Sequence, residues 1–384
     1  TGSASGELPT YAGYDYAANF TCQIPAKALA GTGGTTRPVV YGHGLLGGAD
    51  EAENSQVAKI ASTNDMMYCA TDWIGMSEGD VGNAVKILND VSLFPSLPDR
   101  SQQGILDQLV LAREMTAKDG FAKDPAFASA GGASVIDGTE AYYDGNSQGG
   151  IMGGAATAVS TEWTKAVLGV PGMDYALLLS RSVDFSEYFA VLKGAYPDPI
   201  DQALLYPILS MLWDRGEAQA YAQHMTDHPY AKTPKHQVVL DVGFGDHQVS
   251  TYAAEMEART IGAAVRGPAL APGRHPDAKP FYGLQTLTKF PTDRSMLVYW
   301  DSGSLPPPPG NITPAASPAF AAACAGKTKD QIEKDAKCAD PHEDPRRATG
   351  SIAEKDAFFR PDGKFVDACD GAPCTAKHRA DLDY

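Results

Sequence analysis

Apolar residues occur in short runs rich in β-branched and aromatic side chains, and turn-forming residues separate these runs. Runs of this length and composition are typical of buried strands. The predicted strands are NFTCQI from Asn19, RPVVYG from Arg37, MMYCAT from Met66, AYYD from Ala141, AVLGVP from Ala166, QVVLDVG from Gln237 and SMLVYW from Ser295. We expect the first of them at an edge of the sheet.

Amphipathic stretches lie between these runs. In residues 101–118, apolar side chains recur at helical spacing at Ile105, Leu109, Ala112 and Met115. Further helices are predicted at 54–65, from Ile151, from Thr251 and at 350–359. The alternation of strand and helix predicts an α/β fold, with a mostly parallel central sheet flanked by helices on both faces.

One segment interrupts this alternation. Residues 173–233 are predicted to be helical and are rich in Leu, Tyr, Phe, Trp and Met. They divide the chain into an N-terminal part of the core (1–172), a helical lid or cap insertion (173–233) and a C-terminal part of the core (234–384). The last part contains the Pro-rich spacer LPPPPG at 305–310 and a C-terminal extension with four cysteines.

The charge of the chain argues against two classes of partner. The 384 residues carry a formal net charge of −16, and a polyanion repels both nucleic acid and acidic lipid surfaces. No apolar run is long enough to span a bilayer, so no stable membrane insertion is expected. The sequence does not predict the oligomeric state.

Six cysteines fit a set of three disulfides, for which fifteen connectivities exist. Spacing favours Cys324 with Cys338 and Cys369 with Cys374, which leaves Cys22 to pair with Cys69. Disulfides indicate an oxidising compartment. The opening TGSASGELPT is polar, as expected of a mature chain that has lost a signal peptide. We therefore expect a secreted or periplasmic protein.

Gly145-Asn146-Ser147-Gln148-Gly149 matches the pattern G-x-S-x-G. A serine on a sharp turn between a strand and a helix needs small neighbours on either side, because they lie close together and against the adjoining strand. An apolar strand precedes this motif, and a helix rich in small residues follows it. Ser147 is therefore the candidate nucleophile.

At this motif the chain resembles the α/β-hydrolase superfamily, and more loosely its secreted lipases and carboxylesterases, from about Arg37 to Phe359. Residues 41–48 (YGHGLLGG) resemble the superfamily's oxyanion loop. The resemblance implies that the backbone N–H groups of Leu45 and Gln148 hold the oxyanion and that His43 is structural. Residues 72–77 (DWIGMS) resemble its D-x-x-G loop, a scaffold or pocket wall. Leu46 and Trp73 are the predicted substrate-binding residues.

A serine nucleophile needs a base, and the base needs an orienting acid. In this superfamily the chain order is Ser, acid, His. Residues 243–249 (GFGDHQV) resemble its acid-bearing segment, which makes Asp246 the predicted acid, with Asp174 as the alternate. His342 follows the last predicted strand and is the predicted base, with His275 as the alternate. No metal site is predicted.

The resemblance and these residues predict a secreted serine hydrolase of carboxylic esters that needs no cofactor. The apolar insertion favours a small-molecule or polymeric hydrophobic ester as substrate. Two alternatives keep the fold, namely a secreted acyltransferase and a serine peptidase. A third alternative is a hydrolase-like binding module without activity.

Overall fold

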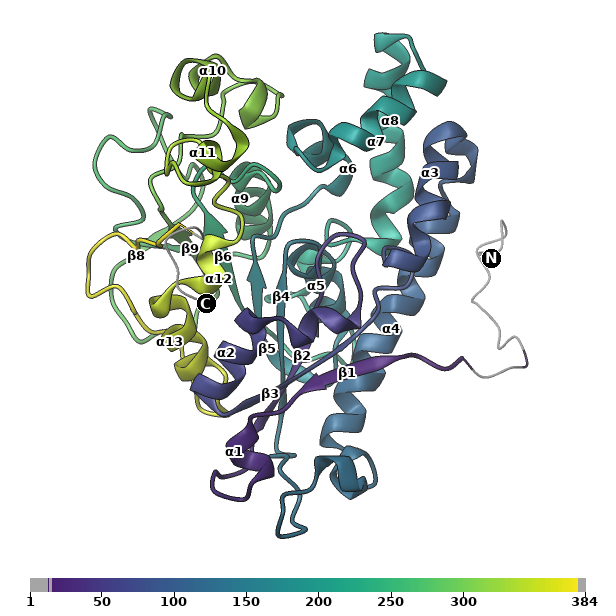
Figure 1. Ribbon diagram of the computed structural model, residues 1–384, viewed down its shortest axis with the longest axis vertical. Helices are drawn as coiled ribbons and strands as arrows, with labels where there is room; N and C mark the ends of the chain where they lie inside the picture. Colours follow the sequence, from purple (N-terminus) through teal and green to yellow (C-terminus); the bar gives the residue numbers. More distant parts are fainter. Residues whose placement is uncertain (1–12, 14–15, 379–384) are drawn as a thin grey trace.

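The computed structural model describes residue 13 and residues 16–378 (Figure 1). The polar opening, from which we predict a removed signal peptide, lies outside this part, as do the last six residues. The described chain forms one nine-stranded sheet in the order β1-β3-β2-β4-β5-β6-β9-β7-β8. The strands are β1 (Phe20–Gln23), β2 (Arg37–Gly42), β3 (Met66–Thr71), β4 (Ala141–Asn146), β5 (Trp163–Gly169), β6 (Gln237–Gly243), β7 (Ala264–Arg266), β8 (Thr286–Leu287) and β9 (Met296–Trp300).

All neighbouring strands run parallel except β1, which pairs antiparallel with β3 at the edge. The expected α/β fold with a mostly parallel sheet is therefore confirmed. Parallel strands place all their carboxyl ends at one edge of the sheet. The loops that follow Gly42, Asn146, Gly243 and Trp300 start from this edge, and each leads to a candidate site residue.

Each face of the sheet packs against its own apolar core, because successive side chains of a strand point to opposite faces. On β2, Val39 and Tyr41 belong to one core and Val40 belongs to the other. The helices α2 and α13 cover the first face, and α4 and α5 cover the second (Figure 1). The sheet is thus buried on both sides, as a parallel sheet requires.

The helices match most of the amphipathic stretches. Outside residues 173–233 they are α1 (Ala26–Leu29), α2 (Ser55–Asn64), α3 (Val81–Asn89), α4 (Ser96–Thr116), α5 (Gln148–Val159), α9 (Thr251–Thr260), α10 (Pro318–Cys324), α11 (Lys329–Glu333), α12 (Asp344–Arg347) and α13 (Thr349–Phe358). The helix expected at 101–118 begins earlier, at Ser96. No helix of the described chain is long and apolar enough to cross a membrane.

Residues 173–233, between β5 and β6, contain α6 (Tyr175–Leu178), α7 (Phe185–Ala195) and α8 (Pro199–Trp213). Trp213 is buried and stacks on Tyr175, with ring centroids 4.4 Å apart, and it contacts Phe94 edge-on at 5.2 Å. The apolar residues of this segment therefore pack partly on one another and partly on the core. Ile200 and Leu204, on the outer side of α8, remain exposed.

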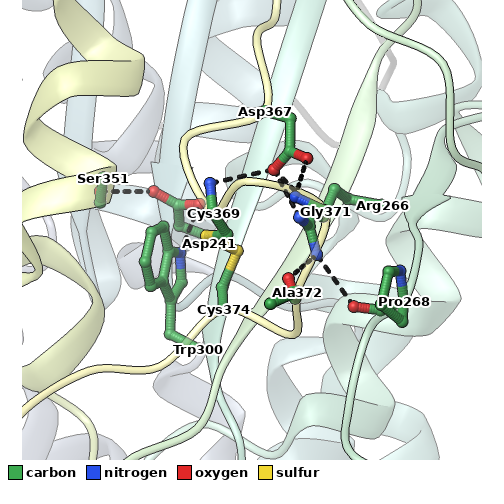
Figure 2. Close-up of a disulfide and its surroundings, with 10 residues drawn as sticks. All are labelled: Asp241, Arg266, Pro268, Trp300, Ser351, Asp367, Cys369, Gly371, Ala372 and Cys374. Carbon is green, nitrogen blue, oxygen red and sulfur yellow. Dashed lines mark hydrogen bonds and ion pairs between the residues drawn. A yellow bond between two sulfur atoms is a disulfide. The ribbon is translucent and has the colours of Figure 1, made fainter.

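Buried polar contacts fasten the C-terminal segment to the sheet. The Ser351 hydroxyl on α13 donates to Asp241 on β6 at 2.9 Å, and the Trp300 indole donates to the same carboxylate at 3.0 Å (Figure 2). Lys355 forms a buried ion pair with Asp144 on β4 at 2.7 Å. These bonds hold α13 against the sheet, and α12 lies between α13 and the loop that carries His342.

Three disulfides pair Cys22 with Cys69, Cys324 with Cys338, and Cys369 with Cys374, as the spacing predicts. The described chain has no free cysteine. Figure 2 shows the last disulfide beside the buried Arg266, whose guanidinium pairs with Asp367. Three disulfides suit an oxidising environment.

The stabilisation by each disulfide should increase with the logarithm of the length of the loop that it closes. The chain-entropy relation gives about 4 kcal/mol for Cys22–Cys69, whose cysteines are 47 residues apart, and about 2 kcal/mol for Cys369–Cys374, which are 5 apart. Urea unfolding of the two double Cys→Ala variants, without reductant, measures the difference. Equal losses of unfolding free energy would contradict the loop-length account.

Two strands were not predicted. The strands β7 and β8 have three and two residues, and they extend the sheet beyond β9. Segments this short carry no measurable alternation of apolar and polar residues. SMLVYW is the last strand along the chain, as expected, but it lies inside the sheet.

Candidate active site

Ser147 lies on a sharp turn between β4 and α5, with φ 60° and ψ −125°. This left-handed conformation is rare for a residue with a side chain. The glycines beside it make the turn possible, because a Cβ at Gly149 would stand 2.0 Å from the Gly42 carbonyl oxygen and one at Gly145 would stand 2.4 Å from the Gly149 oxygen. Both positions therefore require a residue without a Cβ, as the motif predicts.

Asp246 and His342 meet across the sheet edge although they are 96 residues apart. His342 Nδ1 lies 2.8 and 3.0 Å from the two carboxylate oxygens of Asp246. A carboxylate only accepts hydrogen bonds, so Nδ1 carries the proton and Nε2 keeps a lone pair. Within the described chain, Nε2 is buried and has no hydrogen-bond partner. His342 and Ser147 line the same cavity.

The carboxylate of Asp246 is itself oriented. Its Oδ1 accepts the backbone N–H groups of Gln248 at 2.8 Å and Val249 at 2.9 Å. Aspartate is also a common helix N-cap residue, but Asp246 does not cap α9, because α9 begins after Ser250. Both carboxylate oxygens therefore face His342, and the loop after β6 fixes their direction.

The two alternates lie elsewhere. His275 packs between the rings of Phe244 and Phe281, and its Nδ1 accepts the backbone N–H of Asp277 at 3.1 Å. Asp174 accepts the N–H of Ala176 and the hydroxyl of Ser210 on α8. The structure brings neither residue against the Asp246–His342 pair.

The sequence predicts the backbone N–H groups of Leu45 and Gln148 as the oxyanion donors. Within the described chain, neither N–H group donates a hydrogen bond to another protein group. The N–H of Leu46 is occupied, because it donates to the side-chain oxygen of Gln148 at 3.3 Å. The Gln148 amide in turn donates to the Met76 carbonyl at 2.7 Å, so the Gln148 side chain links both the oxyanion loop and the 72–77 loop to the start of α5.

His43 and Glu51 brace this loop. His43 is fully buried, its Nε2 accepts the N–H of Trp73 at 2.8 Å, and Nδ1 therefore donates to the Gly44 carbonyl at 2.8 Å. Burial lowers the pKa of His43, which keeps the ring neutral. Glu51 accepts the N–H of Gly44 at 2.7 Å. Both residues hold the loop in shape and make no contact with the Asp246–His342 pair.

An apolar cavity borders Ser147. Its wall includes Leu46, from the oxyanion loop, and residues of α3, α4 and the 173–233 segment. The main apolar side chains are Met76, Ile87, Leu88, Val91, Phe94, Leu97, Ile151, Leu178, Phe185, Leu209 and Trp213. Trp73 is fully buried in the core and lies outside both described cavities, so we assign it no contact with substrate.

A second, polar cavity also borders Ser147. It is lined by His342, by residues of the oxyanion loop and α2, and by charged side chains of α12. The polar side chains are Glu51, Asn54, Ser55, Gln56, Asn146, Gln248, Glu343, Arg346 and Arg347. Ser147 thus borders two cavities, one with an apolar wall and one with a polar wall.

Sequence reasoning missed two features of the site. Asp184 is the one charged residue on the described wall of the apolar cavity, and burial raises its pKa to about 6. Arg346 bridges Glu51 and Glu343 in the polar cavity, at 3.1 and 2.8 Å. Asp184 directly precedes α7, and an aspartate at this position of a sequence is normally interpreted as a helix cap. Glu343 is only three residues from Arg346, but Glu51 is 295 residues away and cannot be found from spacing.

The electrostatics of the pair set its pH dependence. Burial opposes a charged imidazolium, but the Asp246 carboxylate outweighs it, with help from Asp340 and Glu343, and raises the pKa of His342 to about 10. A general base must be neutral, so kcat/KM should rise with pH along a limb centred above the ordinary histidine pKa of 6.5. Without the Asp246 carboxylate, the largest contribution that raises the pKa of His342 is lost, while burial still lowers it. In Asp246→Asn we therefore expect a limb at lower pH and a kcat reduced about 10⁴-fold. A pH series of both proteins measures this, and an unmoved limb would contradict it.

The sheet order, the parallel strands and the strand–serine–helix turn are those of the α/β-hydrolase fold. No protein-family model and no curated protein matches the chain. Among solved structures it is similar to an acylaminoacyl peptidase from Pyrococcus horikoshii, with 12% identity, a TM-score of 0.39, and coverage of 76% of this chain and 36% of that one. The chain thus spans about a third of that protein's length.

Two esterase structures are also similar. An acetyl xylan esterase from Paenibacillus sp. R4 has 13% identity and a TM-score of 0.39, over 59% of this chain and 65% of that one. A cold-adapted esterase from an Arctic intertidal metagenomic library has 15% identity and a TM-score of 0.35, over 79% and 82%. Such identities make no statement about substrates, which depend on the side chains of each site.

Proposed function

We propose that this protein is a serine hydrolase of carboxylic esters, with Ser147 as nucleophile, His342 as general base and Asp246 as the orienting acid. One observation carries the proposal. His342 is anchored to Asp246 through Nδ1, while its free Nε2 lies at the cavity that Ser147 also lines. A buried nitrogen without a partner is costly unless a substrate or a reacting group satisfies it.

The chemistry follows from these positions. His342 Nε2 takes the proton of the Ser147 hydroxyl as Oγ attacks the ester carbonyl. The N–H groups of Leu45 and Gln148 donate hydrogen bonds to the oxyanion of the tetrahedral intermediate, each contributing about 3 kcal/mol to lowering the barrier. His342 then gives its proton to the leaving alcohol, and water releases the acyl group by the same steps. Asp246 keeps the imidazole in the required tautomer throughout.

The apolar cavity supports a hydrophobic ester as substrate, and the helices of 173–233 would act as its lid. Burial of an acyl chain against these side chains contributes about 25 cal/mol for each Å² removed from water. Three disulfides support a secreted or periplasmic location. A peptidase or an acyltransferase would use the same nucleophile, and the products formed with peptide substrates or with an added alcohol distinguish them.

The experiment is labelling of the folded protein with a fluorophosphonate probe, combined with turnover of p-nitrophenyl esters of increasing chain length. We expect one label, which peptide mass spectrometry maps to Ser147, and turnover that the probe abolishes. Folded protein without label and without ester turnover would overturn the proposal and favour a binding module. Labelling with peptide cleavage but no ester turnover would favour the peptidase.

A further inference from the structure

The two cavities at Ser147 have different neighbours, and this difference decides which half of an ester each one holds. His342 lines the polar cavity and is not part of the described wall of the apolar cavity. In acyl transfer the histidine must protonate the oxygen of the leaving alcohol. The leaving alcohol therefore has to lie on the His342 side, in the polar cavity. The acyl chain then occupies the apolar cavity.

The charges of the polar cavity neutralise one another. Arg346 donates to Glu51 and Glu343, and to the Tyr41 hydroxyl at 2.7 Å, while Arg347 donates to Glu343 at 3.0 Å. Two carboxylates and two guanidinium groups thus form one network. A ligand with a net charge gains little from such a balanced lining, whereas an uncharged ligand with many hydroxyls meets no unpaired charge.

Two kinds of hydrogen-bonding group at the wall of the same cavity have no protein partner in the described chain. The side-chain oxygen of Gln56 is buried and has no partner in the described chain, although the Gln56 amide donates to the Arg346 carbonyl. Gln56 lies in the first turn of α2, where Asn54 makes no side-chain cap, so the first N–H groups of this ten-residue helix keep their donor capacity. A hydroxyl group both donates and accepts, and it can satisfy both kinds of group.

We infer that the substrate is an ester of an apolar carboxylic acid with a neutral polyhydroxy alcohol of the glycerol or sugar type, held by Gln56 and the start of α2. This inference rests on the proposed function. In the reaction, the bond between the acyl carbon and the alcohol oxygen breaks, and a bond between that carbon and Ser147 Oγ forms. The proton of Oγ passes through His342 to the alcohol oxygen. Water then releases the acid and restores Ser147.

Matched esters test the orientation on the wild-type protein. Glyceryl hexanoate and hexyl glycerate join the same two kinds of group in opposite directions, and propyl hexanoate lacks only the two free hydroxyls of the first ester. We expect kcat/KM for glyceryl hexanoate to exceed that of each of the others by about tenfold or more, because two hydrogen bonds are gained. Equal or faster turnover of hexyl glycerate or propyl hexanoate would overturn the inference.

A pair of variants tests the role of Gln56. Gln56→Met keeps the size of the side chain and removes the unpartnered acceptor, together with the amide that donates to the Arg346 carbonyl. It should lower the preference for glyceryl over propyl hexanoate about fivefold. Gln102→Met, on an exposed face of α4, is the control and should leave the preference unchanged. If Gln56→Met does not fold, Ser55→Ala, an exposed position at the same cavity, replaces it with an expected loss of about threefold.

The two proposals fail in different ways. Absence of p-nitrophenyl hexanoate turnover and of probe labelling refutes the hydrolase. Turnover of p-nitrophenyl hexanoate without the preference for glyceryl hexanoate refutes only the assignment of the polar cavity. A preference for the glycerol ester that carries an added phosphate over the neutral one would also refute it, since it would show an anion at α2.

Discussion

Turnover of p-nitrophenyl hexanoate by Ser147→Ala should fall about 10⁶-fold below that of the wild type, because Oγ forms the covalent intermediate and no other group replaces it. The fold should persist. Ser147 is 8% exposed, and its backbone is held by the Gly169 carbonyl, which accepts the Ser147 N–H at 2.9 Å. We therefore expect the free energy of unfolding to change by about 1 kcal/mol or less. Initial rates and urea unfolding measure the two quantities.

The matched control is Ser186→Ala, an exposed serine of α7 that lines neither described cavity. It should retain wild-type turnover and should still take up a fluorophosphonate label, which Ser147→Ala should not. Turnover of Ser147→Ala within about tenfold of the wild type would show that another group attacks the ester, and the triad assignment would be wrong.

The features of the site that could be predicted from the sequence are those determined by residues close together in the chain. Gly145 and Gly149 stand two residues from Ser147 because the turn leaves no room for a Cβ, and this constraint is visible in five consecutive letters. Strands such as β2, β4 and β6 are similarly local, since each is a single apolar run between turns. Disulfide pairing also followed from spacing, because two of the three loops are short.

The remainder depends on contacts between distant segments. The loop from β9 to His342 passes through α10 and α11 and a disulfide before it returns to Asp246, and only chain order favoured His342 over His275. The loop Asp72–Ser77 shows the opposite case. Its aspartate binds the N–H of Ala49, and the indole of Trp73 turns into the core, so a loop that resembles a pocket wall does not present its largest side chain to the pocket.

The division of the site into an apolar and a polar half was equally hidden from the sequence. The apolar half combines residues 45–97 with the 173–233 segment, and the polar half combines α2 with α12, which are about 290 residues apart. No periodicity connects such segments. Only the fold shows that they meet at Ser147, and only the side on which His342 lies gives the two halves different chemical roles.

Replacing His342 with alanine should reduce kcat about 10⁶-fold, nearly as much as loss of the nucleophile, because a serine hydroxyl without a base is a weak nucleophile. His275→Ala should keep kcat within about threefold of the wild type. The reason is that the His275 ring packs against Phe244 and Phe281 and does not bond to Asp246. This variant should lower the free energy of unfolding by about 1 kcal/mol. The two variants together decide which histidine is the base.

His342→Ala leaves the Asp246 carboxylate buried without its partner, which is strongly destabilising, so a loss of activity could reflect unfolding. Two measurements separate the causes. His342→Gln retains a donor for Asp246 and should fold with a higher stability than His342→Ala, yet it should be as inactive, because an amide cannot act as a base. Added imidazole should restore part of the turnover of His342→Ala by occupying the vacated space beside Asp246. Loss of activity in His275→Ala, with His342→Gln active, would reverse the assignment.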